Sequence, residues 1–145
     1  MPSLILLVSL LSLFSLNTVT ARESIVGGRP TTSEDYPYQI SLEHLGQHIC
    51  GGSILNEKSI LTAAHCTHEY PNNLTIRAGT STIGHGGSVY QPSKITTHPK
   101  FNPETGDYDV AVITLSSDIA LDASARPITL SSATLQPGHN CTATG

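Results

Sequence analysis

The stretch that decides the fold is HICGGSILNEKSILTAAHC, residues 48–66. It contains two consecutive segments of strand length, HICGGSIL and SILTA, that are rich in isoleucine and leucine, so it predicts two successive β-strands. The stretch ends with a histidine, His65, followed by a cysteine, Cys66. A side chain capable of acid–base chemistry therefore follows a predicted apolar strand.

Similar short strands are predicted on both sides of this stretch. The segments are YQISL, LTIRAGTS, SKITTH and DVAVITL, and turn-rich sequences such as YPNN, GHGG and HPKFNPETGD separate them. No window long enough for a stable helix keeps an apolar stripe of helical period. Together these segments predict an all-β fold, a small antiparallel six-stranded β-barrel.

The composition narrows the range of partners. The chain has 145 residues, with 7 Lys+Arg against 11 Asp+Glu and a net charge of −4. The basic residues occur singly along the sequence, so they form no stripe that could follow a phosphate backbone. Nucleic acid is therefore not expected as a partner.

Residues 1–21 have the properties of a cleaved signal peptide. The apolar run at residues 4–16 is shorter than the roughly 20 residues that a membrane-spanning helix needs. Val19 and Ala21 supply the small residues of a cleavage site. A buried hairpin or a membrane anchor would give the same run. The signal peptide predicts a secreted, extracellular protein, with no membrane association after cleavage and with disulfides permitted.

Two positions carry side chains suited to proton transfer. His65 has a side chain that can take and return a proton near neutral pH. Asp109 enters the apolar segment DVAVITL, where a partly buried carboxylate needs hydrogen bonds or a charged partner. The pattern alone leaves two ordinary explanations open, a packed histidine and a strand-end acid satisfied by backbone N–H groups. A disulfide between Cys50 and Cys66 would close a loop of about 15 residues beside His65 and stabilise the fold by about 3 kcal/mol.

Five blocks of sequence together resemble the trypsin- and chymotrypsin-like serine endopeptidases. They are IVGG (25–28), PYQISL (37–42), CGGSIL (50–55), ILTAAHC (60–66) and DYDVAVITL (107–115). The resemblance runs from residue 25 to residue 145 and covers the N-terminal half of such an enzyme. It implies the first six-stranded β-barrel of the two-barrel chymotrypsin-like fold, an interdomain linker and the start of a second barrel, the rest of which is missing.

The resemblance implies a role for each residue that matches a family motif. His65 matches the general base that activates a serine nucleophile, and Asp109 matches the carboxylate that orients the imidazole. Cys50 and Cys66 match a disulfide that braces the histidine. Ile25 matches the residue whose α-ammonium group forms an internal ion pair after zymogen cleavage. Residues 22–24 are then a short propeptide, and residues 25–145 are the peptidase domain.

Other features of the family have no match in this sequence. The GDSGG block that carries the nucleophile is absent, as is the expected bonding partner of Cys141, so we expect these 145 residues alone to be inactive. Ser24 precedes Ile25, where a Lys or Arg is usual. Residues 78–101 contain no Asp or Glu, so a hard cation finds no charged oxygen ligand there. Neither a metal nor another cofactor is expected.

The predicted function is that of a secreted trypsin-like serine endopeptidase that acts on protein or peptide substrates, represented by a fragment. Two alternatives stay open, a non-catalytic secreted binding protein and a degenerate truncated product. Asn73, in the motif NLT, and Asn140, in the motif NCT, match the pattern of a glycosylation acceptor. Asn73 is the better candidate because Asn140 lies next to a cysteine and a predicted strand.

Overall fold

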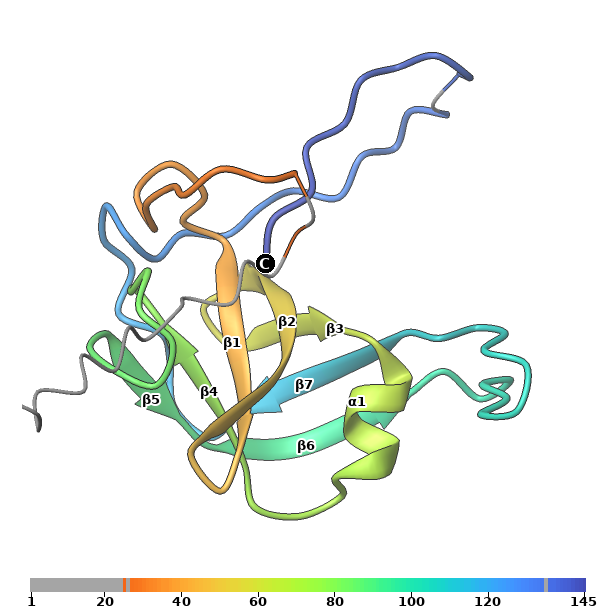
Figure 1. Cartoon of the computed structure of the whole chain (residues 1–145). Coiled ribbons are helices and arrows are strands. Elements are labelled where there is room, and N and C mark those ends of the chain that lie inside the picture. The colour runs from red at the N-terminus through yellow and green to blue at the C-terminus, as the bar shows by residue number, and fades with distance from the viewer. Residues whose placement is uncertain (1–24, 26, 135) are drawn as a thin grey trace, which may run out of the picture.

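The computed structural model describes residues 25, 27–134 and 136–145. The predicted signal peptide (1–21) and propeptide (22–24) lie outside these residues. The described part forms one antiparallel sheet with the strand order β5-β4-β1-β2-β3-β7-β6 (Figure 1). The strands and the single helix are β1 Gln39–His44, β2 Gln47–Asn56, β3 Ser59–Thr62, α1 Ala64–Glu69, β4 Leu74–Ala78, β5 Ser88–Tyr90, β6 Pro92–Thr97 and β7 Ala111–Leu115.

The sheet curls into a barrel because its two outermost strands are neighbours in the sequence. Only Gln91 separates β5 from β6. β5 pairs with β4, whereas β6 pairs with β7, so residues 88–97 act as one bent strand that joins the two sides of the sheet. The Gln91 carbonyl accepts a hydrogen bond from the N–H of Ser116 at 2.9 Å, just after β7. The six predicted strands are all present, and β5 is the additional one.

Alternating apolar residues of the strands fill the barrel. In β4 the burial alternates residue by residue, and β7 shows the same pattern. This period of two is what points every second side chain toward one face of a strand. The fully buried aliphatic side chains come from five different strands: Leu42, Ile54, Ile60, Ile76, Ile113 and Leu115. Each such burial stabilises the fold by about 1.5–3 kcal/mol.

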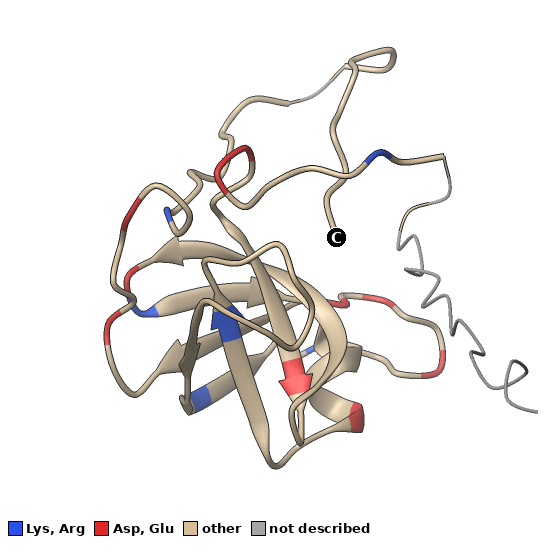
Figure 2. Cartoon of the chain, turned by 60° about the vertical axis from the view of Figure 1, so that its left-hand side comes forward, with Lys and Arg blue, Asp and Glu red and all other residues tan. Residues whose placement is uncertain are grey.

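One buried ion pair lies outside this aliphatic core. Glu43, at the β1 bulge, is only 1% exposed. Its carboxylate accepts hydrogen bonds from Arg77 Nε at 2.7 Å and Nη2 at 3.2 Å. Arg77 Nη1 also donates to the carbonyl oxygen of Gly86 at 2.8 Å, so the pair ties β1 and β4 to the loop before β5. The other charged residues are dispersed over the fold, and neither sign gathers on one side in this view (Figure 2).

The short helix α1 was not predicted from the sequence. Its six residues follow β3 after a single intervening residue, Ala63. Six residues cover fewer than two turns, so an apolar stripe of helical period has no room to repeat. The helix instead buries Ala64, Cys66 and Thr67 against the barrel. It therefore owes its place to packing and to the chain that precedes it, rather than to a long amphipathic pattern.

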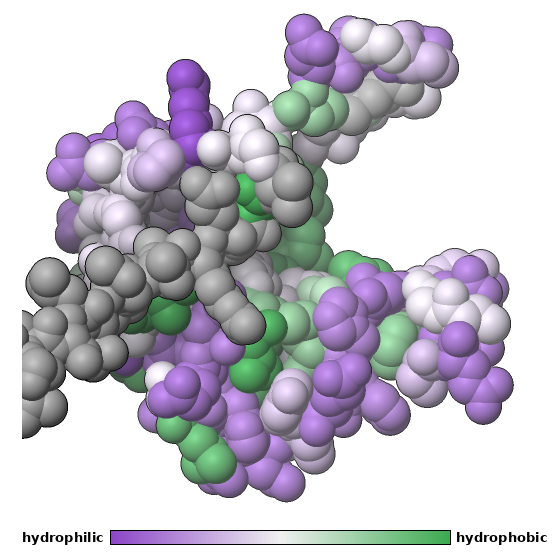
Figure 3. Space-filling view, in the orientation of Figure 1, coloured by the Kyte–Doolittle hydropathy of each residue, from purple (hydrophilic) through white to green (hydrophobic). Residues whose placement is uncertain are grey.

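Residues 126–134 and 136–145 form an extended segment that projects from the barrel and then returns (Figure 1). The described part of this segment contains no strand, so the strand expected around Cys141 is not formed. Ile128 N–H donates to the Ile54 carbonyl at 2.9 Å, and Thr144 Oγ1 donates to Gln39 Oε1 at 2.7 Å. A hollow separates the projecting part from the barrel (Figure 3). Among the described residues, no helix has the length and apolar character needed to cross a membrane.

Candidate active site

His65 lies in the first turn of α1, where backbone N–H groups have no partner within the helix. Ala63, at the N-cap position, has no side-chain group that could accept a hydrogen bond from them. The acceptor comes instead from a residue 44 positions away: Asp109 Oδ1 accepts a hydrogen bond from the N–H of His65 at 2.8 Å. A carboxylate at this end of a helix also interacts favourably with the helix dipole.

Asp109 is held in a tight turn that precedes β7. The N–H of Val110 donates to the carbonyl of Tyr108 at 2.8 Å, across Asp109. Tyr108 adopts a positive φ of 55°, which is uncommon for a residue other than glycine. Its ring stacks on His98, with ring centroids 4.8 Å apart and planes 4° from parallel. Lys100 Nζ lies 5.6 Å from the centre of the Tyr108 ring. These contacts fix the backbone that carries Asp109.

The two predicted site residues meet through their side chains. His65 Nδ1 lies 2.7 Å from Asp109 Oδ2, so the two carboxylate oxygens bind the backbone and the ring of the same residue. The His65 side chain is 52% exposed and the Asp109 side chain 30% exposed. Asp109 is therefore covered only in part, because it precedes β7 rather than lying within it.

The same hydrogen bonds set the charge of Asp109. The bonds from the His65 ring and from the His65 backbone N–H hold the pKa of the Asp109 carboxyl below its ordinary value of 3.8. Both bonds favour the ionised form of the acid. Asp109 is therefore a carboxylate at neutral pH, and an Nδ1–H group of His65 is the donor that it requires.

The lowered pKa of the Asp109 carboxyl predicts how the stability of the folded state depends on pH. A carboxyl whose pKa is lowered by folding stabilises the folded state above its unfolded pKa, and loses that contribution as the pH falls through the folded pKa. We expect the Asp109 carboxyl to titrate below 3.8 in the folded chain, as followed by carbon NMR of labelled aspartate. The variant His65→Ala should move the midpoint back toward 3.8. An Asp109 midpoint above 3.8 in the unsubstituted chain would contradict the arrangement.

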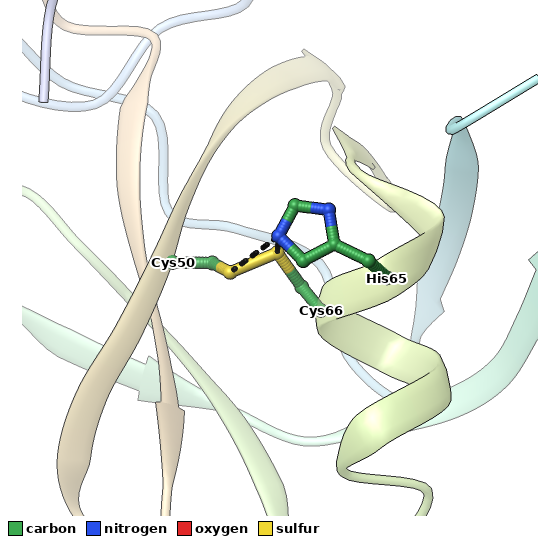
Figure 4. Close-up of side chains that lie close together, drawn as sticks. All are labelled: Cys50, His65 and Cys66. Atoms are coloured by element: carbon green, nitrogen blue, oxygen red, sulfur yellow. Dashed lines mark hydrogen bonds between the residues drawn. A yellow bond between two sulfur atoms is a disulfide. The ribbon is translucent and has the colours of Figure 1, made fainter. Parts of the chain in front are cut away.

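The second ring nitrogen of His65 faces a disulfide. Cys50 and Cys66 are bonded, with Cα atoms 6.3 Å apart, as the family resemblance predicted. His65 Nε2 lies 3.3 Å from Cys66 Sγ and 3.9 Å from Cys50 Sγ (Figure 4). The three side chains have the composition of a metal site, but both sulfurs are already bonded to each other and so are not thiolate ligands. The disulfide supports the imidazole instead.

The disulfide is expected to stabilise the fold. Its cysteines are 16 positions apart, so the bond restricts the unfolded chain and contributes about 3 kcal/mol to the free energy of unfolding in the chain-entropy account. We expect the double variant Cys50→Ala/Cys66→Ala to lose about that much free energy of unfolding in urea. Cys141→Ala is the matched control, because Cys141 is a free, exposed cysteine. A double variant as stable as this control would show that the bond does not brace the fold.

Ile25 makes a local backbone contact. Its carbonyl oxygen accepts a hydrogen bond from the N–H of Gly28 at 3.0 Å, across a turn in which Gly27 has a φ of 75°. The structure does not join Ile25 to the pair formed by His65 and Asp109. The proposed role of its α-ammonium group concerns a cleaved chain and stays a prediction.

The sequence did not reveal the contacts that position the pair. The ring of His68, one turn along α1 from His65, packs edge-on against Phe101 at 5.8 Å between centroids. Phe101 lies in the loop that leads to Asp109, so this contact joins the helix to that loop. The sequence HPKFNPETGDYD shows its aromatic and histidine residues, but it does not show which distant residues they contact in the folded chain.

Comparison with known proteins identifies the family of this chain. The sequence model of the family described as Trypsin matches residues 25–145. Trypsin beta of Drosophila erecta is 40% identical over 122 residues, which are 83% of this chain and 48% of the relative. Hypodermin-A of Hypoderma lineatum is 42% identical over 107 residues, 73% of this chain and 42% of the relative. Trypsin 5G1 of Aedes aegypti is 36% identical over 115 residues, 79% of this chain and 43% of the relative.

The chain spans about half the length of these curated relatives. The family match covers every block that carried the resemblance, from IVGG to DYDVAVITL, and the barrel and the disulfide fit it. The chain therefore belongs to the trypsin family of serine proteases.

Proposed function

We propose that His65 and Asp109 supply the general base and the orienting carboxylate of a secreted serine endopeptidase that hydrolyses protein or peptide substrates. One observation carries the proposal: the Asp109 carboxylate contacts both the backbone and the ring Nδ1 of His65. With the Nδ1 proton directed at Asp109, the Nε2 lone pair of a neutral imidazole is free to accept another proton.

The chemistry of the pair follows from these two contacts. Nε2 of His65 takes the proton of a serine hydroxyl as that oxygen attacks the scissile carbonyl, and later returns it to the leaving amine. Asp109 stays ionised and stabilises the imidazolium between these two steps. Its second bond, to the His65 backbone, prevents the carboxylate from turning away from the ring.

The proposal requires a serine that approaches Nε2. Within the described residues, His65 Nε2 contacts the two disulfide sulfurs, which carry no hydrogen and so cannot supply the proton that this nitrogen would accept. Residues 1–145 contain GGS twice, but no GDSGG. We therefore assign three features to sequence of the kind found in the other half of the relatives. They are the nucleophile, the donors that stabilise the oxyanion and the acid that forms an ion pair with the Ile25 ammonium group. Secretion rests on the leader at residues 1–21 and on the presence of a disulfide.

A chimera tests this function. Residues 25–145 are fused to the C-terminal remainder of a relative such as Trypsin beta of Drosophila erecta, and peptide hydrolysis is measured after release of Ile25 as the N-terminus. We expect turnover that disappears in the variant His65→Ala. Residues 25–145 alone are the control and should be inert. A correctly folded chimera without turnover, or turnover unaffected by His65→Ala, would contradict the proposal.

A further inference from the structure

The motif NLT, residues 73–75, spans the end of the loop that follows α1 and the start of β4. Asn73 is the last residue before this strand and is exposed. It has a φ of 57°, in the left-handed region that asparagine adopts more readily than most residues. The next two residues enter β4: Leu74 is 3% exposed and belongs to the core, whereas Thr75 is half-buried. The barrel thus holds Leu74 inside while Asn73 stays on the surface.

The side chain of Asn73 is available for modification. In the part of the chain that the structure describes, its amide group makes no hydrogen bond. Its main chain is fixed, because the N–H of Leu45 donates to the Asn73 carbonyl at 3.2 Å. Leu45 lies in the two-residue turn between β1 and β2, so this bond joins the tip of that hairpin to the turn before β4. The amide therefore projects from a well-defined turn into solvent.

The position of this turn leaves the proposed active site open. The turn lies beyond the C-terminal end of α1, whereas His65 lies in the first turn of the helix. In Figure 1 the loop between α1 and β4 and the turn between β1 and β2 lie together at the bottom of the barrel, and residues 126–145 lie at the top. A bulky group on Asn73 would therefore be attached beyond the end of α1 that lies away from His65, and at the end of the barrel opposite the described part of the C-terminal segment.

The neighbouring hairpin tip presents an apolar side chain to solvent. Leu45 is 70% exposed, more than any other large apolar residue in the described part of the chain. A single exposed leucine is common on protein surfaces. This one, however, lies beside Asn73, where the first sugars of a glycan would cover it. The hydrogen bond between the two backbones keeps the two positions together.

We propose that Asn73 carries an N-linked oligosaccharide that covers Leu45. The donor is a lipid-pyrophosphate-linked oligosaccharide whose first sugar is N-acetylglucosamine. Asn73 Nδ2 attacks C1 of that sugar and loses one proton, the new Nδ2–C1 bond forms, and the C1–O bond to the pyrophosphate breaks, so that the lipid pyrophosphate leaves. The proposal rests on entry into the secretory pathway but does not depend on proteolytic activity.

The test is expression of the full chain in secreting insect cells, followed by mass mapping before and after an enzyme that removes N-linked glycans. We expect the peptide containing Asn73 to lose the mass of a glycan and to carry an aspartate in place of the asparagine, because the enzyme hydrolyses the side-chain amide. Thr75→Ser keeps the acceptor motif and should keep the glycan. Thr75→Val replaces the hydroxyl group by a methyl group of similar volume and should abolish the glycan. Asn73→Gly removes the amide and suits the positive φ, so the loss of the glycan is separated from misfolding.

Two further arms separate the possible outcomes. Asn140→Gln removes the other acceptor motif and should leave the Asn73 glycan unchanged. The same series is repeated behind a well-characterised secretory leader in place of residues 1–21. A glycan on Asn73 only with the substituted leader would support the site and refute the proposed signal peptide. An unmodified Asn73 in chain secreted by either leader would overturn the site. An Asn73→Gly variant that binds no more of a hydrophobic dye than the glycosylated chain would overturn the covering of Leu45.

Discussion

Asp109→Asn is expected to lower kcat of the chimeric protease by about 10⁴-fold, the magnitude known for the same change in well-studied members of this family. An asparagine side chain keeps the shape of the aspartate but can place its amide N–H toward His65 Nδ1, which then accepts rather than donates. The histidine proton moves to Nε2, where it faces the serine that the base should deprotonate. Measurement of kcat and KM on one peptide substrate gives the effect, and KM should change far less than kcat.

Asp107→Asn is the matched control for this substitution. Asp107 lies two positions earlier in the same loop, and its carboxylate accepts a hydrogen bond from Thr105 Oγ1 at 2.8 Å rather than from His65. We expect Asp107→Asn to leave kcat nearly unchanged. An equal loss of activity in both variants would mean that the loop, and not the contact between Asp109 and His65, controls the rate.

The second large effect concerns the ion pair between Glu43 and Arg77. Arg77→Met removes the cation and leaves the Glu43 carboxylate at 1% exposure without its partner. Breaking a buried ion pair in this way costs about 3–5 kcal/mol, because the remaining charge is desolvated and unpaired. The substitution also removes the hydrogen bond that holds the Gly86 carbonyl. Urea unfolding of residues 25–145 at neutral pH should show this loss.

Two comparisons show whether the charge itself is responsible. Lys58→Met breaks the exposed pair between Lys58 and Asp118, which are 3.4 Å apart and more than half exposed, and should cost at most about 1 kcal/mol. The double variant Glu43→Leu/Arg77→Met removes both charges and should recover most of the lost stability. If the double variant is no more stable than Arg77→Met, the loss comes from packing rather than from the unpaired carboxylate.

The strands were predictable because short apolar segments of strand length lie between turn-rich sequences. Segments such as LTIRA and AVITL place every second side chain in the core, and this local pattern does not depend on the rest of the chain. β5 was not predicted because its three residues are too few for alternation to be recognised. The closure of the barrel likewise depends on which strands pair, and pairing is a contact between distant residues.

The site was predictable in its residues but not in its construction. His65 and Asp109 were found through short motifs, each contained in one segment of the chain. The capping of α1 by Asp109 and the stacking of Tyr108 on His98 join segments that approach only in the folded state. The pairing of Glu43 with Arg77 also depends on segments that approach only in the folded state. The two residues lie on adjacent strands, at positions whose side chains would ordinarily face solvent.

The most direct test of the account is the position of the proton on His65 in the neutral imidazole. Long-range nitrogen–proton correlation NMR of isotope-labelled histidine in residues 25–145 distinguishes the two tautomers, which heavy-atom positions alone do not. Because Nδ1 lies 2.7 Å from a carboxylate oxygen, we predict that the proton is on Nδ1 and that Asp109→Asn moves it to Nε2. A proton on Nε2 in the unsubstituted chain, or a tautomer that Asp109→Asn leaves unchanged, would contradict the claim that this pair is built to accept a proton from serine.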